Sequence, residues 1–429
     1  MGKVMHITIL AVGTRGDVQP YLALGARLRR EGYQVKIATT LDFEILARQY
    51  DLEFGPISVN MQELMQSQKG QSFISTNRNP VEFVRQMKGL MQQEAFKLFD
   101  EFKVACEGTD LIVFSMMGVA GYSIAQKLKV PAIAAFIQPF TPTAEMPGFM
   151  LPPWLRLGGA FNLFSYYMSN QVYWAFFGPL MNRWRKEALG LPPLSWIGPF
   201  GEAHETGLTT LYGFSPTIVS RPNDWKPSVH VTGFWYLDPP SDWQPPQPLL
   251  DFLEAGPPPI YLGFGSMSWR KPEELGQIVL KALRRSGQRG LLLKGWGGLK
   301  VSELPDNVFM VENIPHTWLF PRMAAVVHHG GMGTTAAGLR AGVPSLVIPF
   351  FADQPFWGDR IYKLGVGPKP IPIWRLTAEK LTEGLHELTV SQTLQRRAKA
   401  LGLSLKAEDG TGAAVKVMEQ SLSKKSLKK

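Results

Sequence analysis

Short apolar runs alternate with amphipathic segments along both halves of the chain, and the second half repeats the pattern of the first. Runs of this kind are typical of strands buried on both faces of a parallel sheet, and helical periodicity marks the segments between them. The alternation predicts an α/β protein with helices on both faces of its sheets. Strands are expected at residues 7–12, 34–39, 111–115, 132–137, 260–264, 291–294, 324–327 and 345–349, and helices at about 20–31, 120–128, 272–285 and 394–420.

A proline-rich segment of low regularity separates the two halves. Its composition is that of a linker, so two Rossmann-like, doubly wound domains are expected to face a cleft. The expected domains are residues 1–238 (N-terminal), 239–259 (linker), 260–400 (C-terminal), 401–420 (a terminal helix that packs back on the N-terminal domain) and 421–429 (a basic tail).

The most informative segment is a glycine turn, which we define as residues 328–335 (HHGGMGTT). Its glycines lack the Cβ atoms that would keep a ligand away from the backbone. Thr334 and Thr335 are expected to open a helix, whose free N–H groups and positive dipole end favour an anion. The turn is therefore predicted to bind phosphate. Histidines before it and the pair Asp353–Gln354 after it suit a phosphate that carries a sugar.

Length, charge and cysteine content restrict the class of protein. The 429 residues exceed the roughly 250–300 at which single cores stop growing. A single cysteine, Cys106, excludes a disulfide framework and indicates a reducing compartment. The first apolar run is too short for a secretory signal, so a cytoplasmic protein is expected. The net charge of +10 comes partly from tail lysines, and aromatic-basic nucleic-acid motifs are missing, so no nucleic-acid partner is expected.

Residues 157–182 form an uncharged stretch rich in aromatic side chains. The stretch is long enough to span a bilayer, at ~20 residues, but several polar residues interrupt it. Helices that line an apolar ligand pocket and touch a membrane surface are the favoured interpretation. The alternative is an ordinary buried helical hairpin.

Four sequence blocks distributed over both halves resemble one enzyme family. They are residues 13–21 (GTRGDVQPY), 212–216 (YGFSP) with 230–235 (HVTGFW), 263–267 (GFGSM), and a long block from 313–320 (NIPHTWLF) to 354–357 (QPFW). Together they resemble nucleotide-sugar-dependent glycosyltransferases of the GT-B fold, and specifically the sterol glucosyltransferase group. The resemblance implies that glucose is transferred from UDP-glucose to a hydroxyl with inversion, without a metal or another cofactor.

The chain's own residues agree with a metal-free donor site, because no Asp-x-Asp pair occurs in the sequence. Fixed dipoles and hydrogen-bond donors would then stabilise the leaving diphosphate. The resemblance assigns His329 to a phosphate oxygen, and Asp353 and Gln354 to the sugar hydroxyls. The donor-binding residues expected in this way are Ser266, Trp296, Ile314, His329, Gly331, Gly333, Thr334, Thr335, Asp353 and Gln354.

Three of these assignments have simpler alternatives. Ser266, a second phosphate contact by resemblance, has the residue type of a helix or turn cap. Trp296 is expected to stack on the uracil near residues 311–315, although a core tryptophan is common. Relatives often carry a tryptophan where this chain has Val311, which alters the expected stacking. Asp353 before Gln-Pro would otherwise be a turn residue.

Asp17 is the candidate general base. An acceptor alcohol must lose its proton as it attacks the anomeric carbon, which requires a carboxylate or histidine nearby. Many relatives have a histidine in the first βα loop, and here that loop holds Asp17 instead. The alternative is an N-cap for the following helix, and the two roles are compatible.

The acceptor is expected to bind the N-terminal domain. Residues 136–142 follow a predicted strand and resemble the acceptor loop of the family, and the aromatic stretch would cover it. Such a lining suits a sterol, a lipid or another flat hydrophobic alcohol. The expected acceptor-binding residues are Gln138, Phe140, Thr141, Phe161, Phe164 and Trp174.

The sequence therefore predicts a UDP-glucose-dependent glucosyltransferase that forms a β-glucoside of a hydrophobic alcohol, peripheral on a membrane. One alternative is a transferase that moves a dTDP- or UDP-linked sugar to a polyketide or peptide natural product. Another is a non-catalytic, nucleotide-sugar-binding membrane protein, although the combination of Asp17, His329, Asp353 and Gln354 argues against lost chemistry.

Overall fold

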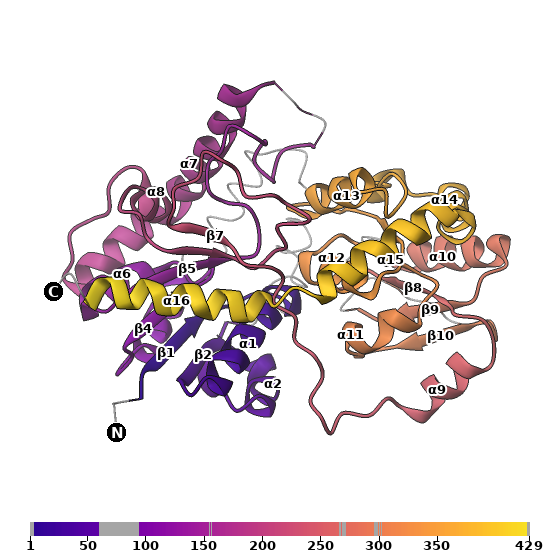
Figure 1. Ribbon diagram of the computed structural model, residues 1–429, viewed down its shortest axis with the longest axis horizontal. Coiled ribbons are helices and arrows are strands. Elements are labelled where there is room, and N and C mark those ends of the chain that lie inside the picture. Colours follow the sequence, from indigo (N-terminus) through magenta and orange to yellow (C-terminus); the bar gives the residue numbers. More distant parts are fainter. Residues whose placement is uncertain are drawn as a thin grey trace. The chain divides into compact units, whose positions relative to one another are not determined.

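The computed structural model describes residues 4–59, 94–153, 155, 157–265, 267, 272–295, 299, 301 and 303–426 (Figure 1). These residues form two compact units. Unit 1 contains the described residues up to Trp235 and again from Asp409 onward, and unit 2 contains those from Tyr236 to Glu408. Each unit is described by itself.

Unit 1 is built on a parallel sheet whose described strands follow the order β3-β2-β1-β4-β5-β6-β7. Strand β1 pairs with β2 on one side and with β4 on the other, so the winding of the chain reverses between β1 and β4. In open parallel sheets, ligands bind at the carboxyl ends of the strands beside this reversal. The strands are β1 (His6–Leu10), β2 (Gln34–Thr40), β3 (Glu53–Ile57), β4 (Leu111–Phe114), β5 (Ala132–Phe136), β6 (Thr210–Tyr212) and β7 (Val229–Val231).

The last helix of the chain, α16, belongs to unit 1 and packs against α1 (Figure 1). Arg27 of α1 forms an ion pair with Asp409 at 3.0 Å, just before α16 begins. The hydroxyl of Tyr33 donates to Glu419 at 2.9 Å. These contacts attach the end of the chain to its first βα unit. The described helices of unit 1 include α1 (Arg15–Arg30), α2 (Glu44–Gln49), α6 (Ala120–Leu128), α7 (Gly159–Trp184), α8 (Gly198–Glu205) and α16 (Gly410–Ser426).

Unit 2 contains a second parallel sheet, with the described strands in the order β10-β9-β8-β11-β12. Its winding reverses between β8 and β11, which pair directly. The strands are β8 (Ile260–Gly263), β9 (Gly290–Leu293), β10 (Val308–Val311), β11 (Ala325–His328) and β12 (Ser345–Val347). The helices include α9 (Gln247–Glu254), α10 (Pro272–Ser286), α11 (His316–Leu319), α12 (Met332–Ala341), α13 (Gln354–Lys363), α14 (Ala378–Val390) and α15 (Gln392–Lys406).

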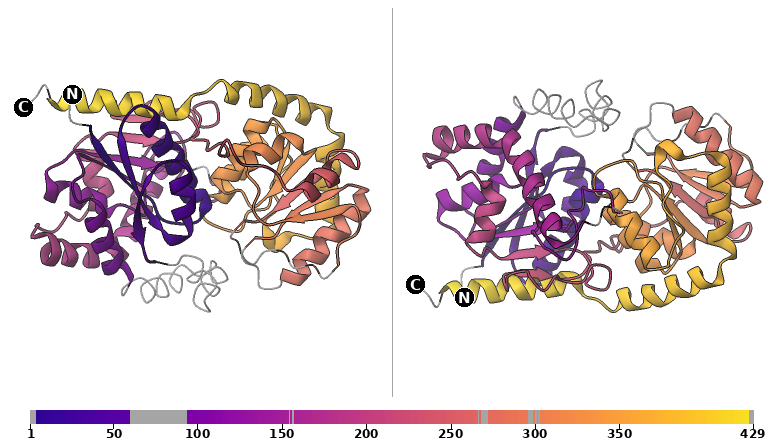
Figure 2. Two further views of the ribbon diagram at one scale, coloured as in Figure 1. Left: turned by 90° about the horizontal axis from the view of Figure 1, so that it is seen from below. Right: turned by 90° about the horizontal axis from the view of Figure 1, so that it is seen from above.

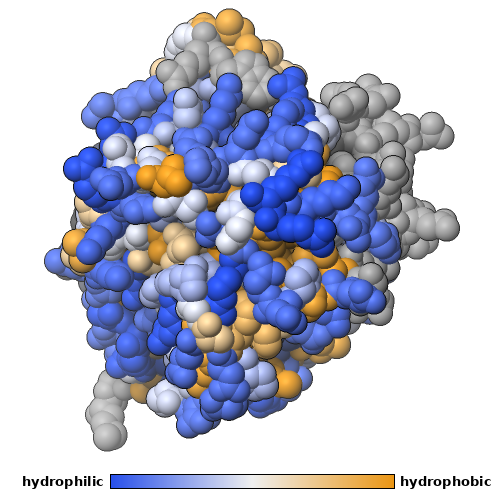
Figure 3. Space-filling view, turned by 90° about the vertical axis from the view of Figure 1, so that its right-hand side faces the viewer, coloured by the Kyte–Doolittle hydropathy of each residue, from blue (hydrophilic) through white to orange (hydrophobic). Residues whose placement is uncertain are grey.

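Both faces of the unit 2 sheet are buried. Ile260 and Leu262 of β8 belong to one hydrophobic cluster, and Tyr261 between them belongs to the other. Successive side chains of a strand point to opposite faces, so helices on both sides are needed to cover them. Figure 2 shows helices on both faces of each sheet. The surface view in Figure 3 shows a face on which hydrophilic side chains predominate, with apolar ones in scattered groups.

The predicted fold class is confirmed: both units are doubly wound parallel α/β structures. The eight strands expected from sequence all form, with ends that differ by one or two residues. Helix α6 begins and ends where the sequence predicts, at Ala120 and Leu128. Short buried strands and their connecting helices are local patterns, which explains this agreement.

Several predicted boundaries were wrong, and local chemistry explains them. Helix α1 begins at Arg15, not near Pro20, because Thr14 and Asp17 form a capping box and Pro20 lies inside the helix. Helix α12 begins at Met332, two residues before Thr334. The expected helix at 394–420 is divided into α15 and α16, with Asp409 at the division.

Two longer segments also differ from expectation. The uncharged stretch forms one long helix, α7, in place of several helices or a hairpin. The proline-rich segment contains the helix α9, whose Leu249 is fully buried in a cluster of unit 2. The segment is thus more ordered than its composition indicates, because burial of one apolar helix face adds stability that composition alone does not reveal.

Candidate active site

In unit 2, the glycine turn lies at the carboxyl end of β11, beside the reversal between β8 and β11. Gly331 is the N-cap of α12 and makes no side-chain cap. The first intrahelical bond is donated by the backbone N–H of Thr335 to Gly331 at 2.9 Å. The N–H groups of Met332, Gly333 and Thr334 therefore have no acceptor among the described residues. A helix start with free donors at a sheet reversal is an anion-binding arrangement.

Buried polar atoms without partners cluster in the same turn. Within the described part of the chain, His328 Nε2, His329 Nδ1 and Thr335 Oγ1 are all buried and lack a hydrogen bond. An unsatisfied buried polar group costs about 1–3 kcal/mol, so three in eight residues is an unusual concentration. Such a cluster is expected where a ligand supplies the missing partners.

The ring of His329 lies between two glycines from neighbouring loops. A Cβ atom at Gly331 would be 2.4 Å from His329 Nε2, and one at Gly265 would be 3.0 Å from its Cε1. Burial lowers the pKa of His329 from 6.5 to about 4, and a backbone contact with Gly263 opposes part of this shift. The imidazole is therefore neutral at physiological pH and can donate one N–H to a phosphate oxygen.

His328 stabilises the glycine turn through a hydrogen bond to its backbone. Its side chain is fully buried, and its Nδ1 accepts a hydrogen bond from the backbone N–H of Gly330 at 3.1 Å. Burial, followed by repulsion from His329 and His316, lowers its pKa well below 6.5. Gly330 has a φ of 93°, and a Cβ there would lie 2.7 Å from a methyl group of Val347. Only glycine fits this position.

The next βα loop of unit 2 places Asp353 and Gln354 differently. Asp353 is partly exposed at the N-cap of α13, and one of its oxygens accepts from the indole N–H of Trp357 at 2.9 Å. Gln354 is 4% exposed, and its oxygen accepts from the backbone N–H groups of Phe350 and Phe351 at 2.7 and 3.3 Å.

The Gln354 amide nitrogen points to the sulfur of Met267, at 3.2 Å. The family resemblance assigned Gln354 to the sugar hydroxyls, where an amide can donate and accept hydrogen bonds. Both lone pairs of its oxygen are used within the protein, so the amide retains only donor capacity. Asp353 remains the more accessible of the two.

The remaining donor-side candidates are less informative. The side chain of Ile314 is 7% exposed and belongs to a hydrophobic cluster of unit 2, so little of it is accessible to a ligand. The backbone N–H and C=O of Ile314 make no hydrogen bond with any described residue. Ser266 and Trp296 lie outside the described residues.

In unit 1, Asp17 lies in the first turn of α1, beside the reversal between β1 and β4. Its Oδ2 accepts from the backbone N–H of Thr14 at 2.9 Å and from the Thr14 hydroxyl at 2.8 Å. Burial raises the pKa of Asp17 above 3.8, and the two bonds from Thr14 oppose the shift. Its Oδ1 has no partner among the described residues. The N-cap of α1 is therefore Thr14 and not Asp17, but Asp17 closes the capping box from the third position of the helix.

Gly13 makes this position of Asp17 possible. A Cβ atom at Gly13 would lie 2.6 Å from the Asp17 Cβ, and the φ of Gly13 is 143°. Thr14 and Gly13 were not identified as functional from sequence. The capping-box spacing from Thr14 to Asp17 was the signal that could have identified them.

The expected acceptor loop follows β5 in the same unit. Phe140 and Thr141 are both 8% exposed, and Gln138 is partly exposed. The ring of Phe140 packs against Phe200 with centroids 4.6 Å apart. Only the edges of Phe140 and Thr141 are therefore available to a ligand.

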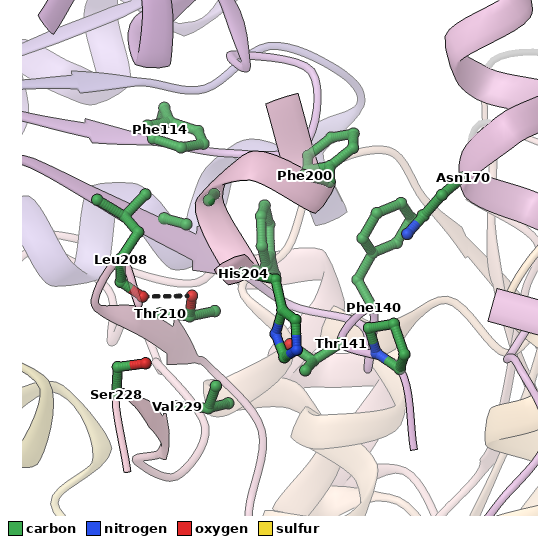
Figure 4. Close-up of a pocket in the computed structure, with 14 residues that line it drawn as sticks. Phe114, Phe140, Thr141, Asn170, Phe200, His204, Leu208, Thr210, Ser228 and Val229 are labelled. Carbon is green, nitrogen blue, oxygen red and sulfur yellow. Dashed lines mark hydrogen bonds between the residues drawn. The ribbon is translucent and has the colours of Figure 1, made fainter. Parts of the chain in front are cut away.

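A small pocket adjoins this loop, as Figure 4 shows. Its walls include Phe140, Thr141, Asn170, Phe200 and His204. It has room for about 30 Å³, enough for water. Pockets for drug-sized ligands measure roughly 300–1,000 Å³. The pocket is therefore not itself a site for a sterol.

The aromatic residues expected on α7 divide into two groups. Trp174 is 9% exposed and packs against α8, where a Cβ at Gly198 would lie 2.7 Å from its ring. Its ring thus joins two helices. Phe161 is partly exposed, and Phe164 is 56% exposed. None of the helices in the described part of the chain combines the length and apolar character required to span a bilayer.

No group of three or more histidine, cysteine, aspartate or glutamate residues that could hold a metal ion occurs within the described ranges.

Comparisons with known proteins agree across the chain. Residues 7–147 match the family model of the glycosyltransferase family 28 N-terminal domain. Residues 295–414 match that of the erythromycin biosynthesis protein CIII-like C-terminal domain.

Curated relatives match 97% of the chain. Two sterol 3-beta-glucosyltransferases of Arabidopsis thaliana are 38% and 37% identical to it, over 66% and 68% of their own lengths. A sterol 3-beta-glucosyltransferase of Pichia angusta is 35% identical, and the match covers 33% of that protein. The chain thus spans about two thirds of the plant relatives and one third of the fungal one.

Solved structures share the architecture over both units. A glycosyltransferase of kitacinnamycin superposes with a TM-score of 0.70 at 19% identity, and covers 97% of this chain and 99% of its own. The calicheamicin glycosyltransferase CalG4 gives a TM-score of 0.68 at 18% identity, covering 98% and 99%. At these identities the likeness shows the GT-B fold alone.

Proposed function

Because the chain belongs to the sterol 3-beta-glucosyltransferase family, we propose that it transfers glucose from UDP-glucose to the hydroxyl of a sterol or a related hydrophobic alcohol. The observation that carries the proposal is the glycine turn with its free helix N–H groups and unpartnered buried polar atoms. This arrangement favours an anionic ligand, and the diphosphate of a nucleotide sugar would be one.

On the donor side, the proposed ligand of the glycine turn is the diphosphate. The N–H groups of Met332, Gly333 and Thr334, the imidazole of His329 and the hydroxyl of Thr335 would donate to its oxygens. These donors are fixed in place before the reaction, and they would stabilise the negative charge that develops on the leaving UDP. In this proposal the transfer needs no metal ion.

On the acceptor side, Asp17 is the proposed general base. It accepts the acceptor's hydroxyl proton on Oδ1, while Thr14 holds Oδ2. The acceptor oxygen forms a bond to the anomeric carbon, the bond from that carbon to the diphosphate oxygen breaks, and UDP leaves with the electron pair. Attack opposite to UDP inverts the configuration and gives a β-glucoside. The raised pKa of Asp17 makes it a stronger base than an ordinary carboxylate.

The test is transfer of label from UDP-glucose to defined acceptors. We expect a labelled β-glucoside when the protein is incubated with a sterol, and little product with a polyketide aglycone or with dTDP-glucose as donor. Product analysis by mass spectrometry and NMR identifies the acceptor and the linkage. Transfer to the aglycone but not to any lipid alcohol would contradict the proposal.

We also propose that α7 contacts a membrane surface. Phe164, Tyr167, Met168 and Val172 lie on α7 and are 45–56% exposed, and residues 157–182 contain no charge. Large apolar side chains in such a row favour the interface between lipid headgroups and acyl chains. A sterol acceptor resides in membranes, so contact there would bring the enzyme to its substrate.

Flotation with anionic vesicles tests this contact. The double variant Phe164→Ser, Met168→Ser should float several-fold less than the wild type. Ile45→Ser, Leu403→Ser is the matched control, because these exposed apolar residues lie on α2 and α15. Equal flotation of the two variants would exclude α7 as the contact.

A further inference from the structure

Tyr212 makes an unusual set of hydrogen bonds at the end of β6. Its hydroxyl accepts from the backbone N–H of Phe140 at 3.1 Å and from that of Thr141 at 2.6 Å. A third bond, of 2.6 Å, joins it to the Thr141 hydroxyl. Because the two N–H groups occupy both lone pairs of the phenol, its own proton is directed to Thr141 Oγ1. One hydroxyl thus satisfies three groups of the acceptor loop, about 70 residues away in sequence.

Trp225 holds the same loop from a second segment. Its indole N–H donates to the carbonyl of Thr141 at 3.2 Å, and its ring stacks on Tyr212 with centroids 4.9 Å apart. Tyr212 is fully buried and Trp225 is 3% exposed. Burial raises the pKa of Tyr212 to about 12, so its hydroxyl keeps its proton throughout the physiological range.

The sequence blocks 212–216 and 230–235 complete this support. The hydroxyl of Thr232 donates to the carbonyl of Tyr212 at 3.0 Å, and the indole of Trp235 donates to Thr232 Oγ1 at 3.0 Å. These bonds fix the strand end from which Tyr212 projects. Both blocks are among those that resemble the family, but none of their residues was assigned to the donor or acceptor site.

The loop is also tied to the helix that carries Asp17. Tyr21 of α1 donates its hydroxyl to the carbonyl of Ala135 in β5 at 2.7 Å, and Tyr21 itself is buried. The residues after β5 therefore have a defined position relative to the first turn of α1. A loop displaced by an ångström would present an acceptor hydroxyl poorly to the proposed base.

We propose that Tyr212 and Trp225 are positioning residues that hold the backbone of Phe140 and Thr141 in the conformation that receives the acceptor alcohol. This inference rests on the proposed transferase function. According to this inference, the two buried side chains contribute to the affinity for the acceptor alcohol without contacting it.

Steady-state kinetics of Tyr212→Phe test the inference. The phenylalanine keeps the ring and its stacking on Trp225, and leaves two backbone N–H groups unsatisfied. The KM for the alcohol should rise roughly ten-fold, as for a lost buried hydrogen bond, while the KM for UDP-glucose stays unchanged. Trp225→Phe removes the bond to the Thr141 carbonyl and reduces the ring area that stacks on Tyr212, but it keeps the hydroxyl of Tyr212 and should shift the acceptor KM in the same direction by less.

Hydrogen exchange supplies a readout that does not need activity. The amides of Phe140 and Thr141 should exchange roughly ten-fold faster or more in Tyr212→Phe. The control is Ile37→Val, a buried change in β2 of the same unit, at a residue that is 0% exposed. It should lower the melting temperature but alter neither the acceptor KM nor these two amides.

The outcomes separate the two proposals. A wild-type protein without transfer activity would overturn the proposed function, and the exchange experiment would still decide whether Tyr212 holds the loop. A wild-type protein that transfers glucose, with an unchanged acceptor KM in Tyr212→Phe, would overturn the positioning role. Equal increases in donor and acceptor KM would overturn it as well.

Discussion

In the proposed mechanism Asp17 is the general base of unit 1, and this role depends on what surrounds its carboxylate. One oxygen is held by Thr14, and the other has no partner within the described residues. Burial raises its pKa, which strengthens it as a base but makes its ionised form unfavourable in the folded state. The raised pKa therefore favours the proposed role of Asp17 as a base but lowers the stability of the folded state in which Asp17 is ionised.

The change Asp17→Asn separates these effects. An amide oxygen can still accept both bonds from Thr14, but it cannot take a proton from the acceptor. We expect kcat to fall by about 10²–10⁴, the usual contribution of a general base. The melting temperature at pH 7 should equal or exceed that of the wild type, because a raised pKa means that the ionised carboxylate destabilises the fold at pH values above it. Calorimetry and initial rates measure the two effects.

Two results would contradict this interpretation of Asp17. One is retention of transfer activity in Asp17→Asn, and the other is a wild-type kcat that stays constant as pH falls. The base must be ionised, so the rate should decline as pH falls through the raised pKa of Asp17.

Asp353 provides a residue-scale test of sugar recognition. In Asp353→Asn the side-chain oxygen can still accept the hydrogen bond from the Trp357 indole, but the negative charge of the side chain is lost. Affinity for UDP-glucose should weaken about 10–100-fold, as expected when a hydrogen bond to a charged group is lost, while affinity for UDP stays the same. Titration calorimetry compares the two ligands.

The matched control for this change is Asp359→Asn on the same helix, α13. Asp359 pairs with Lys363 at the surface. The affinities for UDP and for UDP-glucose should both stay unchanged in this control variant. Equal loss of UDP and UDP-glucose affinity in Asp353→Asn would show that this residue supports the nucleotide site and not the sugar.

At the scale of elements, helix α12 has glycines with positive φ at both of its ends. Gly330, just before it, has a φ of 93°, and Gly342, its C-cap, has a φ of 76°. An alanine at Gly330 would also meet Val347 and the carbonyl of Gln354 at 2.7 and 2.9 Å. At Gly342 the nearest atom would be 3.3 Å away.

The pair Gly330→Ala and Gly342→Ala therefore tests the glycine turn as an anion site. Both should lose stability, by about 1–2 kcal/mol for the left-handed backbone, with more at Gly330 from the clash. Only Gly330→Ala should weaken UDP binding, by roughly ten-fold or more, because it displaces the free N–H groups of α12. If Gly342→Ala weakened UDP binding equally, general destabilisation would be the cause.

At the scale of the whole molecule, the neutral histidines make stability depend on pH. The pKa of His329 falls from 6.5 unfolded to about 4 folded, and that of His328 falls well below 6.5. A depressed pKa means that the unfolded state binds the proton first, so stability is present above pH 6.5 and is lost as pH falls towards 4.

We expect the melting temperature to decline between pH 6.5 and 4, with up to roughly 3 kcal/mol attributable to His329. His329→Gln should flatten this part of the pH profile, because glutamine does not titrate. Thermal unfolding across the range measures the slope. An unchanged slope in the variant would mean that His329 is not the group responsible.

The requirement for a metal ion is also tested at the scale of the whole molecule. Fixed protein donors stabilise the diphosphate in the proposed mechanism, so transfer should retain nearly all of its rate in excess EDTA. Assays with and without EDTA and Mg²⁺ decide this directly. A strict requirement for Mg²⁺ would contradict the metal-free mechanism.

The sequence by itself determined the fold class, the positions of eight strands and the glycine turn, whereas β3, β6, β7 and β10 were not expected from it. Apolar runs, helix periodicity and glycines in left-handed turns are local features, so they can be read without knowledge of distant contacts. The capping box of Thr14 and Asp17 was also present in the sequence as a local signal, and it explains why α1 begins earlier than Pro20 indicates.

Only the tertiary structure decided which way the candidate side chains point. Gln354 turns its amide towards Phe350 and Met267, Trp174 fills the contact between α7 and α8, and Tyr212 holds a loop that precedes it by about 70 residues. Each orientation depends on partners that packing brings together from other segments. A residue type and its spacing identify chemical capacity, but burial and hydrogen-bond partners decide how much of that capacity remains for a ligand.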